Sequence, residues 1–102
     1  MLTSKRKSIY MSAIRKFGKS AQMVVAIEEL SELTKELTKT LREKCNLKNI
    51  SEEMADVEIM LEQLKLIFKN KEQVETLKNY KIHRLDNYLK ELKEGEDHDT
   101  KH

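Results

Sequence analysis

The stretch MVVAIEELSELTKELTKTL, residues 23–41, determines the fold class of this chain. Its apolar side chains recur every three or four residues, the spacing of one face of an α-helix. They are Met23, Ile27, Leu30, Leu33, Leu37 and Leu41. No proline or glycine interrupts the stretch. The pattern therefore predicts a long amphipathic helix, which we expect to cover residues 20–45.

Three further segments show the same periodicity. The first covers residues 4–17, and Gly18 suits the left-handed position just past a helix end. Another begins near Ser51, and the last begins after Asn70, which with Gln73 resembles a capping box. The apolar positions of these last two segments are Ile50, Met54, Val57, Leu61, Leu64 and Phe68, then Val74, Leu77, Ile82, Leu85, Leu89 and Leu92.

Composition agrees with a helical fold, because the chain has 102 residues with no proline and two glycines. Short connections between the last three helices favour antiparallel neighbours. We therefore expect one all-α domain over residues 1–94, an antiparallel bundle of about four helices. We expect the polar segment at residues 95–102 to be a disordered tail.

The charge balance and the single cysteine exclude several classes of function. Twenty basic and eighteen acidic residues give a net charge of +2, too balanced for nucleic-acid binding over the whole chain. Cys45 has no partner for an internal disulfide or a thiolate metal cluster. The sequence shows no signal peptide and no apolar run long enough to span a bilayer. We expect a cytoplasmic protein that uses neither nucleic acid nor membrane.

Two pairs of acidic residues stand on adjacent predicted helices: Glu29 with Glu32, and Glu53 with Asp56. Residues three apart lie about 60° apart around a helix, so each pair shares a face. Two antiparallel helices would bring the four carboxylates together, as oxygen ligands that suit Mg²⁺ or Mn²⁺. The plain alternative is that these are surface charges, with Glu52 and Glu53 in the first turn of their helix, where acids favour the dipole.

The last helix offers charges of the opposite sign. Lys78 and Lys81 fall within its apolar stripe and Arg84 falls at the edge. In the structural interpretation, these lysines bind no ligand and simply extend their amino groups from the stripe to water. They can also hold phosphate oxygens opposite an acidic cluster. Metal, phosphate and cations together are typical of phosphoryl and nucleotidyl chemistry.

These motifs resemble a known family. EELSE at residues 28–32 and EMAD at residues 53–56, with twenty residues between them, match the EExxE…ExxD signature of the MazG-like all-α nucleoside triphosphate pyrophosphohydrolases. The segments FGKSAQMVVAIEELSEL and YKIHRL are also similar to compact bacterial and phage-type members. The resemblance covers about residues 17–89.

The resemblance implies a function and a role for each motif position. Members cleave a nucleoside triphosphate to the monophosphate and pyrophosphate, and commonly form dimers or tetramers whose pockets borrow neighbouring residues. The implied Mg²⁺ ligands are Glu29, Glu32, Glu53 and Asp56, with Mn²⁺ as a substitute. Glu28 and Glu29 are the implied catalytic acids, Glu28 being placed to orient or deprotonate water. The implied phosphate-binding residues are Lys78, Lys81 and Arg84.

Two other classes of protein fit parts of the sequence. A helical adaptor without enzymatic activity would carry the acids as a solvated face. A ferritin-like di-iron bundle needs Glu-x-x-His pairs, and no histidine here has a glutamate three residues before it. Apolar residues off the main stripes favour an interface, and hence a homodimer or homotetramer. They are Val25, Ile59 and Leu66.

Overall fold

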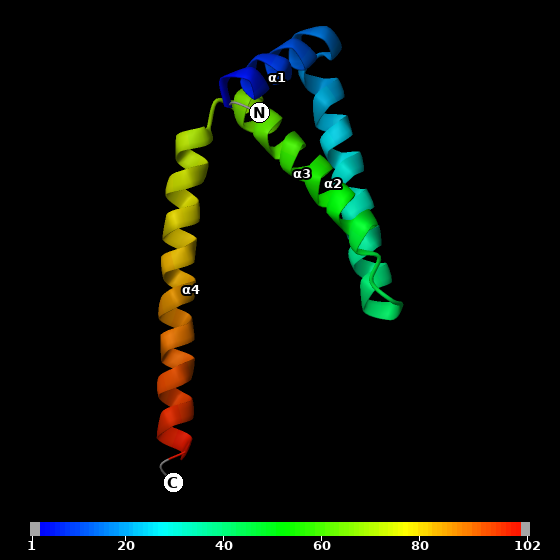
Figure 1. The fold of residues 1–102 in the computed structure, drawn as a ribbon. Helices are drawn as coiled ribbons and strands as arrows, with labels where there is room; N and C mark the ends of the chain where they lie inside the picture. Colours follow the sequence, from blue (N-terminus) through cyan, green and yellow to red (C-terminus); the bar gives the residue numbers. More distant parts are fainter. Residues whose placement is uncertain (1–2, 101–102) are drawn as a thin grey trace. The chain divides into compact units, whose positions relative to one another are not determined.

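Four α-helices make up the secondary structure of the computed structural model, which describes residues 3–100 (Figure 1). In chain order they are α1 (Thr3–Phe17), α2 (Lys19–Arg42), α3 (Leu47–Phe68) and α4 (Lys71–Thr100). Residues 3–100 contain no β-strand. The all-α class predicted from the apolar periodicity is confirmed.

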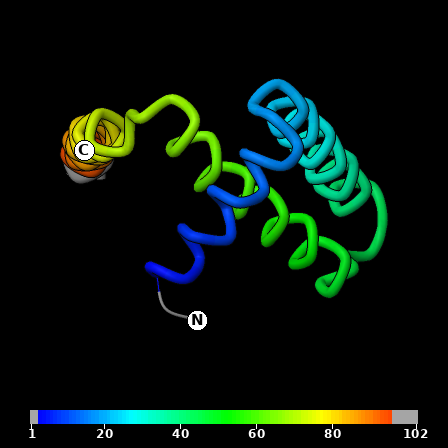
Figure 2. Tube along the Cα trace, turned by 90° about the horizontal axis from the view of Figure 1, so that it is seen from above, coloured from blue at the N-terminus to red at the C-terminus, as the bar shows by residue number. Residues whose placement is uncertain are grey.

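The chain divides into two units, Met1–Lys69 with α1, α2 and α3, and Asn70–His102 with α4. Within the first unit, α2 and α3 run antiparallel along each other, and α1 packs against both (Figures 1 and 2). This three-helix unit holds both acidic motifs. The second unit is a single helix, so a packed bundle is established for α1–α3 only.

The helix boundaries follow local backbone chemistry. Gly18 has φ of 94° and its N–H donates to the carbonyl of Ile14 at 2.8 Å, which ends α1 where the sequence indicated. A side chain there would be strained, because L-residues rarely adopt such a φ. α3 begins four residues earlier than expected, at Leu47 rather than Ser51. The reason is its cap, since the Asn46 side chain accepts the N–H of Asn49 at 3.1 Å.

The last helix reaches further than the expected domain boundary. It begins at Lys71, directly after Asn70, and its bounds extend to Thr100. Most of the segment expected as a tail, residues 95–100, therefore falls within α4. Residues 101–102 lie outside the described part of the chain.

The interior of the first unit is small and mixed in character. The buried apolar residues are Tyr10, Ile14, Ala26, Val57, Met60 and Ile67. Among them lie two buried amides, Gln22 and Gln63, each 6% exposed, with Gln22 Nε2 donating to Gln63 Oε1 at 2.7 Å. This bond joins α2 to α3. It fixes their register, because a shifted pairing would leave a buried amide without a partner.

Most of the leucine stripe of α2 is exposed rather than packed in the interior of this unit. Ile27 is 63% exposed and Leu41 is 89% exposed, and Leu30 and Leu37 are exposed as well. The face that contacts α3 carries Gln22 and Ala26 instead. α2 thus has two faces suited to packing, and α3 covers only one of them.

Candidate metal centre

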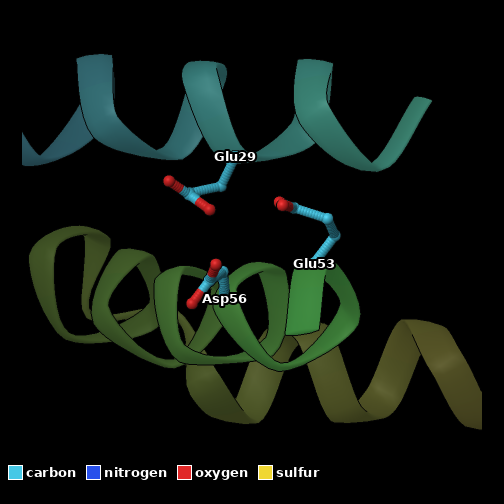
Figure 3. A group of neighbouring side chains, drawn as sticks. All are labelled: Glu29, Glu53 and Asp56. Atoms are coloured by element: carbon cyan, nitrogen blue, oxygen red, sulfur yellow. The ribbon is translucent and has the colours of Figure 1, made fainter. Parts of the chain in front are cut away.

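Three carboxylates from the two acidic motifs meet at the interface between α2 and α3 (Figure 3). Glu29 extends from α2, and Glu53 and Asp56 extend from α3 toward it. One carboxylate oxygen of each residue lies within 4.8 Å of the others. The predicted convergence of acids from two helices is therefore present for three of the four proposed ligands.

The early start of α3 removes one ordinary explanation for its acids. We considered that Glu52 and Glu53 occupy the first turn of their helix, where the dipole favours negative charge. Because α3 begins at Leu47, its first turn contains no acidic residue. Glu53 and Asp56 lie further along the helix, where the dipole gives them little support.

Burial and mutual repulsion raise the pKa of Glu29 above its ordinary value of 4.5. The main cause is desolvation, which disfavours the charged form. A hydrogen bond with Asp56 and the negative charges of Asp56, Glu53 and Glu32 raise the pKa further. The surroundings of Glu29 therefore disfavour its charged form.

The pKa of Glu53 is also raised above its ordinary value of 4.5. Desolvation raises its pKa most, followed by the charges of Asp56, Glu32, Glu36 and Glu52. Its Oε2 atom is buried and has no hydrogen-bond partner within the described part of the chain. A buried carboxylate oxygen without a partner is costly, so it indicates that a cationic or hydrogen-bonding group belongs beside it.

The remaining acids of the first motif lie at the margin of the cluster. Glu32 is exposed and pairs with Lys35, whose Nζ lies 3.7 Å from its Oε1. Its charge still raises the pKa of both Glu29 and Glu53, so it lies near the three clustered carboxylates. Glu28 is exposed and stands outside the cluster of three.

One neighbouring acid was missed from the sequence. The Glu36 side chain is 16% exposed, and its charge raises the pKa of Glu53. Its Oε1 lies 3.6 Å from Lys39 Nζ. The signal was available, because Glu36 lies seven residues after Glu29 and so shares its helix face.

The basic residues assigned to phosphate belong to the other unit. Lys78, Lys81 and Arg84 are exposed on α4. Lys78 Nζ lies 3.3 Å from Glu75 Oε1, and the Arg84 guanidinium lies 5.9 Å from the centre of the Tyr80 ring. These contacts are local to α4, so the assignment to phosphate stays a prediction.

The donor set fits a hard divalent cation. Three carboxylates from two helices offer oxygen atoms, the ligand type that Mg²⁺ and Mn²⁺ prefer. A cation among them would offset the repulsion that raises the two pKa values and would give the buried Glu53 oxygen a partner. Water and substrate oxygens would supply the remaining coordination positions, as is usual for Mg²⁺.

The chain matches no family model, no curated protein and no solved structure. In addition, none of the helices in the described residues has the length and apolar character needed to cross a membrane.

Proposed function

We propose that this protein is a metal-dependent nucleoside triphosphate pyrophosphohydrolase that converts a triphosphate to the monophosphate and pyrophosphate. The observation that carries the proposal is the cluster of Glu29, Glu53 and Asp56, in which a buried carboxylate oxygen has no partner. The resemblance of EELSE and EMAD to the MazG-like signature supplies the reaction.

In this proposal Glu29, Glu53 and Asp56 hold Mg²⁺, or Mn²⁺ in its place, and Glu32 joins them from the exposed edge. The bound cation supplies neutralisation of phosphate charge, the main requirement of phosphoryl chemistry.

Acidic residues of this chain would orient and deprotonate the attacking water. Glu28 lies next to the cluster in sequence and is exposed, so water reaches it. Glu28 orients a water molecule and accepts its proton as the water oxygen bonds to the α-phosphorus, with Glu29 alongside. The bond between the α-phosphorus and the bridging oxygen then breaks, and pyrophosphate leaves. The phosphate contacts proposed from α4 are Lys78, Lys81 and Arg84.

The proposal includes a homodimer or homotetramer. Its support is the exposed apolar face of α2, on which Ile27 and Leu41 are 63% and 89% exposed. Apolar faces of this extent on a soluble chain mark interfaces. The same face favours a second candidate function, a helical adaptor without enzymatic activity. The two candidates differ in whether the protein responds to magnesium.

The test combines melting temperature with pyrophosphate release from a panel of canonical and modified triphosphates. Mg²⁺ should raise the melting temperature, because an ion that binds only the folded state stabilises it. Pyrophosphate should be released from at least one triphosphate. Asp56→Asn should remove both effects, whereas Glu58→Gln, on the same helix but outside the cluster, should retain them. A wild-type protein that ignores Mg²⁺ and every triphosphate would leave the adaptor as the better description.

A further inference from the structure

The polar face that carries the acidic cluster continues toward the connection between α2 and α3. On α2, Glu36 follows Glu29 by seven residues, which is about two helical turns. On α3, Asn49 and Asn46 precede Glu53 by four and seven residues and so share its face. Polar side chains therefore follow this seam from the cluster to the turn, beside the half-buried Leu33 and Ile50.

This polar seam opens into a cavity of about 230 Å³. The lining residues come from the end of α2, the connection and the start of α3: Glu36, Lys39, Thr40, Glu43, Lys44, Asn46 and Asn49. Glu36 lines this cavity and also shares the α2 face of Glu29, two helical turns away. The cavity and the cluster thus adjoin.

The N-terminus of α3 borders this cavity, because Asn46 and Asn49 line it. The helix dipole is positive at this end, which favours an anion nearby. The backbone N–H of Asn49 is already capped by the Asn46 side chain, and the Asn46 carbonyl accepts the N–H of Ile50 at 3.1 Å. The side-chain amide of Asn49 is the group of this helix end that can donate to a phosphate oxygen in the cavity.

Lys39 is the side chain best placed to add a full positive charge. Its amino group lies 3.6 Å from Glu36 Oε1, and its side chain is exposed. An exposed ion pair of this kind contributes little stability, so Lys39 can exchange Glu36 for a phosphate oxygen at small cost. Glu36 and Glu43 offset the charges of Lys39 and Lys44, so the cavity alone is close to neutral.

A neutral cavity beside an acidic cluster selects a particular ligand. Free phosphate would gain little there, because the carboxylates repel it. A polyphosphate that carries its own divalent cation would place the cation among the carboxylates and extend its terminal groups toward the cavity. Asn49 lies about 6 Å along α3 from Glu53, a distance that linked phosphate groups can span.

We propose that this cavity is the subsite for the terminal phosphates of the substrate, and hence for the pyrophosphate product, with Lys39 as the cation that binds them. The inference rests on the proposed function, whose metal site it extends. It adds a phosphate contact from the same unit as the acidic cluster.

The test measures binding of pyrophosphate by calorimetry, with and without Mg²⁺, so that no turnover is needed. Wild type should bind pyrophosphate in the presence of Mg²⁺ and much more weakly without it. Lys39→Met should weaken binding about tenfold, the loss expected for one charged hydrogen bond. Lys39→Arg should stay close to wild type, because it keeps the charge.

Lys35→Met is the matched control. Lys35 also pairs with a glutamate three residues before it, on the same helix, yet it lies outside the cavity. This variant should bind magnesium pyrophosphate like wild type, and each variant's melting temperature verifies its fold.

Three results would overturn the subsite. If the Lys39→Met and Lys35→Met variants bind magnesium pyrophosphate with equal affinity, Lys39 does not bind the phosphates, even if wild type hydrolyses triphosphates. Equal affinities with and without Mg²⁺ would show that the anion binds independently of the acidic cluster. If wild type binds neither Mg²⁺ nor magnesium pyrophosphate and hydrolyses no triphosphate, the proposed function fails and the subsite fails with it.

Discussion

Glu29 on α2 and Asp56 on α3 bring carboxylate oxygens within 4.8 Å of each other across the helix interface. The proximity of Asp56 raises the pKa of Glu29 beyond the effect of burial. A metal ion between the two carboxylates would offset their repulsion, so metal binding competes with protonation of Glu29.

The first prediction concerns pH. Glu29 and Glu53 have raised pKa values in the folded protein, so the folded state binds more protons than the unfolded state above their ordinary pKa of 4.5. Their contribution to stability is therefore present below about pH 4.5 and is lost as pH rises through the raised values. In metal-free buffer, the melting temperature should decrease as pH rises above about 4.5. The decrease should be smaller for Glu29→Gln and Glu53→Gln than for wild type. Parallel curves for all three proteins would contradict the repulsion described here.

Glu32 provides a second prediction, because it lies outside the cluster of three yet belongs to the proposed ligand set. Glu32→Gln should weaken Mg²⁺ binding by about tenfold, the effect typical of a supporting group. Asp56→Asn should weaken it more, since Asp56 belongs to the cluster. Calorimetric titration with Mg²⁺ compares the two variants, with Lys35→Met as a control for loss of the Glu32–Lys35 pair. If Glu32→Gln binds Mg²⁺ like wild type, Glu32 does not belong to the ligand set.

The buried amide pair gives a third prediction. Gln22→Leu alone leaves Gln63 without its partner and should lower the free energy of unfolding by about 1–3 kcal/mol. The double variant with Gln63→Leu should recover much of this loss, because both polar groups are then replaced by apolar ones. Urea denaturation of the wild type, both single variants and the double variant provides the cycle. If the losses of unfolding free energy in the two single variants add up to the loss in the double variant, the hydrogen bond contributes no coupling energy.

A fourth prediction addresses assembly. Ile27→Lys places a charge in the exposed apolar face of α2 and should shift the protein toward monomers at micromolar concentration. Ala21→Lys introduces the same residue at an exposed position of the same helix, about 120° around α2 from Ile27, and should retain the assembly state of wild type. Sedimentation measures the assembly state of wild type and of both variants. A wild type that is already monomeric at this concentration would rule out the proposed oligomer.

The sequence predicted the helices and the shared face within each acidic motif, because both follow from short-range periodicity. Positions three and four apart share a face in any α-helix, so Glu53 and Asp56 were bound to lie together once α3 formed. Which face of α2 contacts α3 did not follow. The leucines form the most apolar face, yet a pair of amides and Ala26 occupy the contact. That choice depends on how two helices fit together, and periodicity within one helix does not encode it.

Two details of the site were also beyond the pattern. The start of α3 at Leu47 depends on the Asn46 side chain bonding backbone at Asn49, and the apolar spacing gave no sign of it. The sequence places Glu36 on the helix face of Glu29, but how deeply its side chain lies depends on packing against α3. Both details shift the polar seam toward the connection between the helices.

The short connection between α2 and α3, residues 43–46, also affects how quickly the chain folds. Helices joined this closely in sequence meet after closing only a small loop, and chains dominated by such local contacts fold within microseconds to milliseconds. The hairpin of α2 and α3 contains Glu29, Glu53 and Asp56 without any contribution from α1. The carboxylate cluster is therefore complete as soon as this hairpin closes.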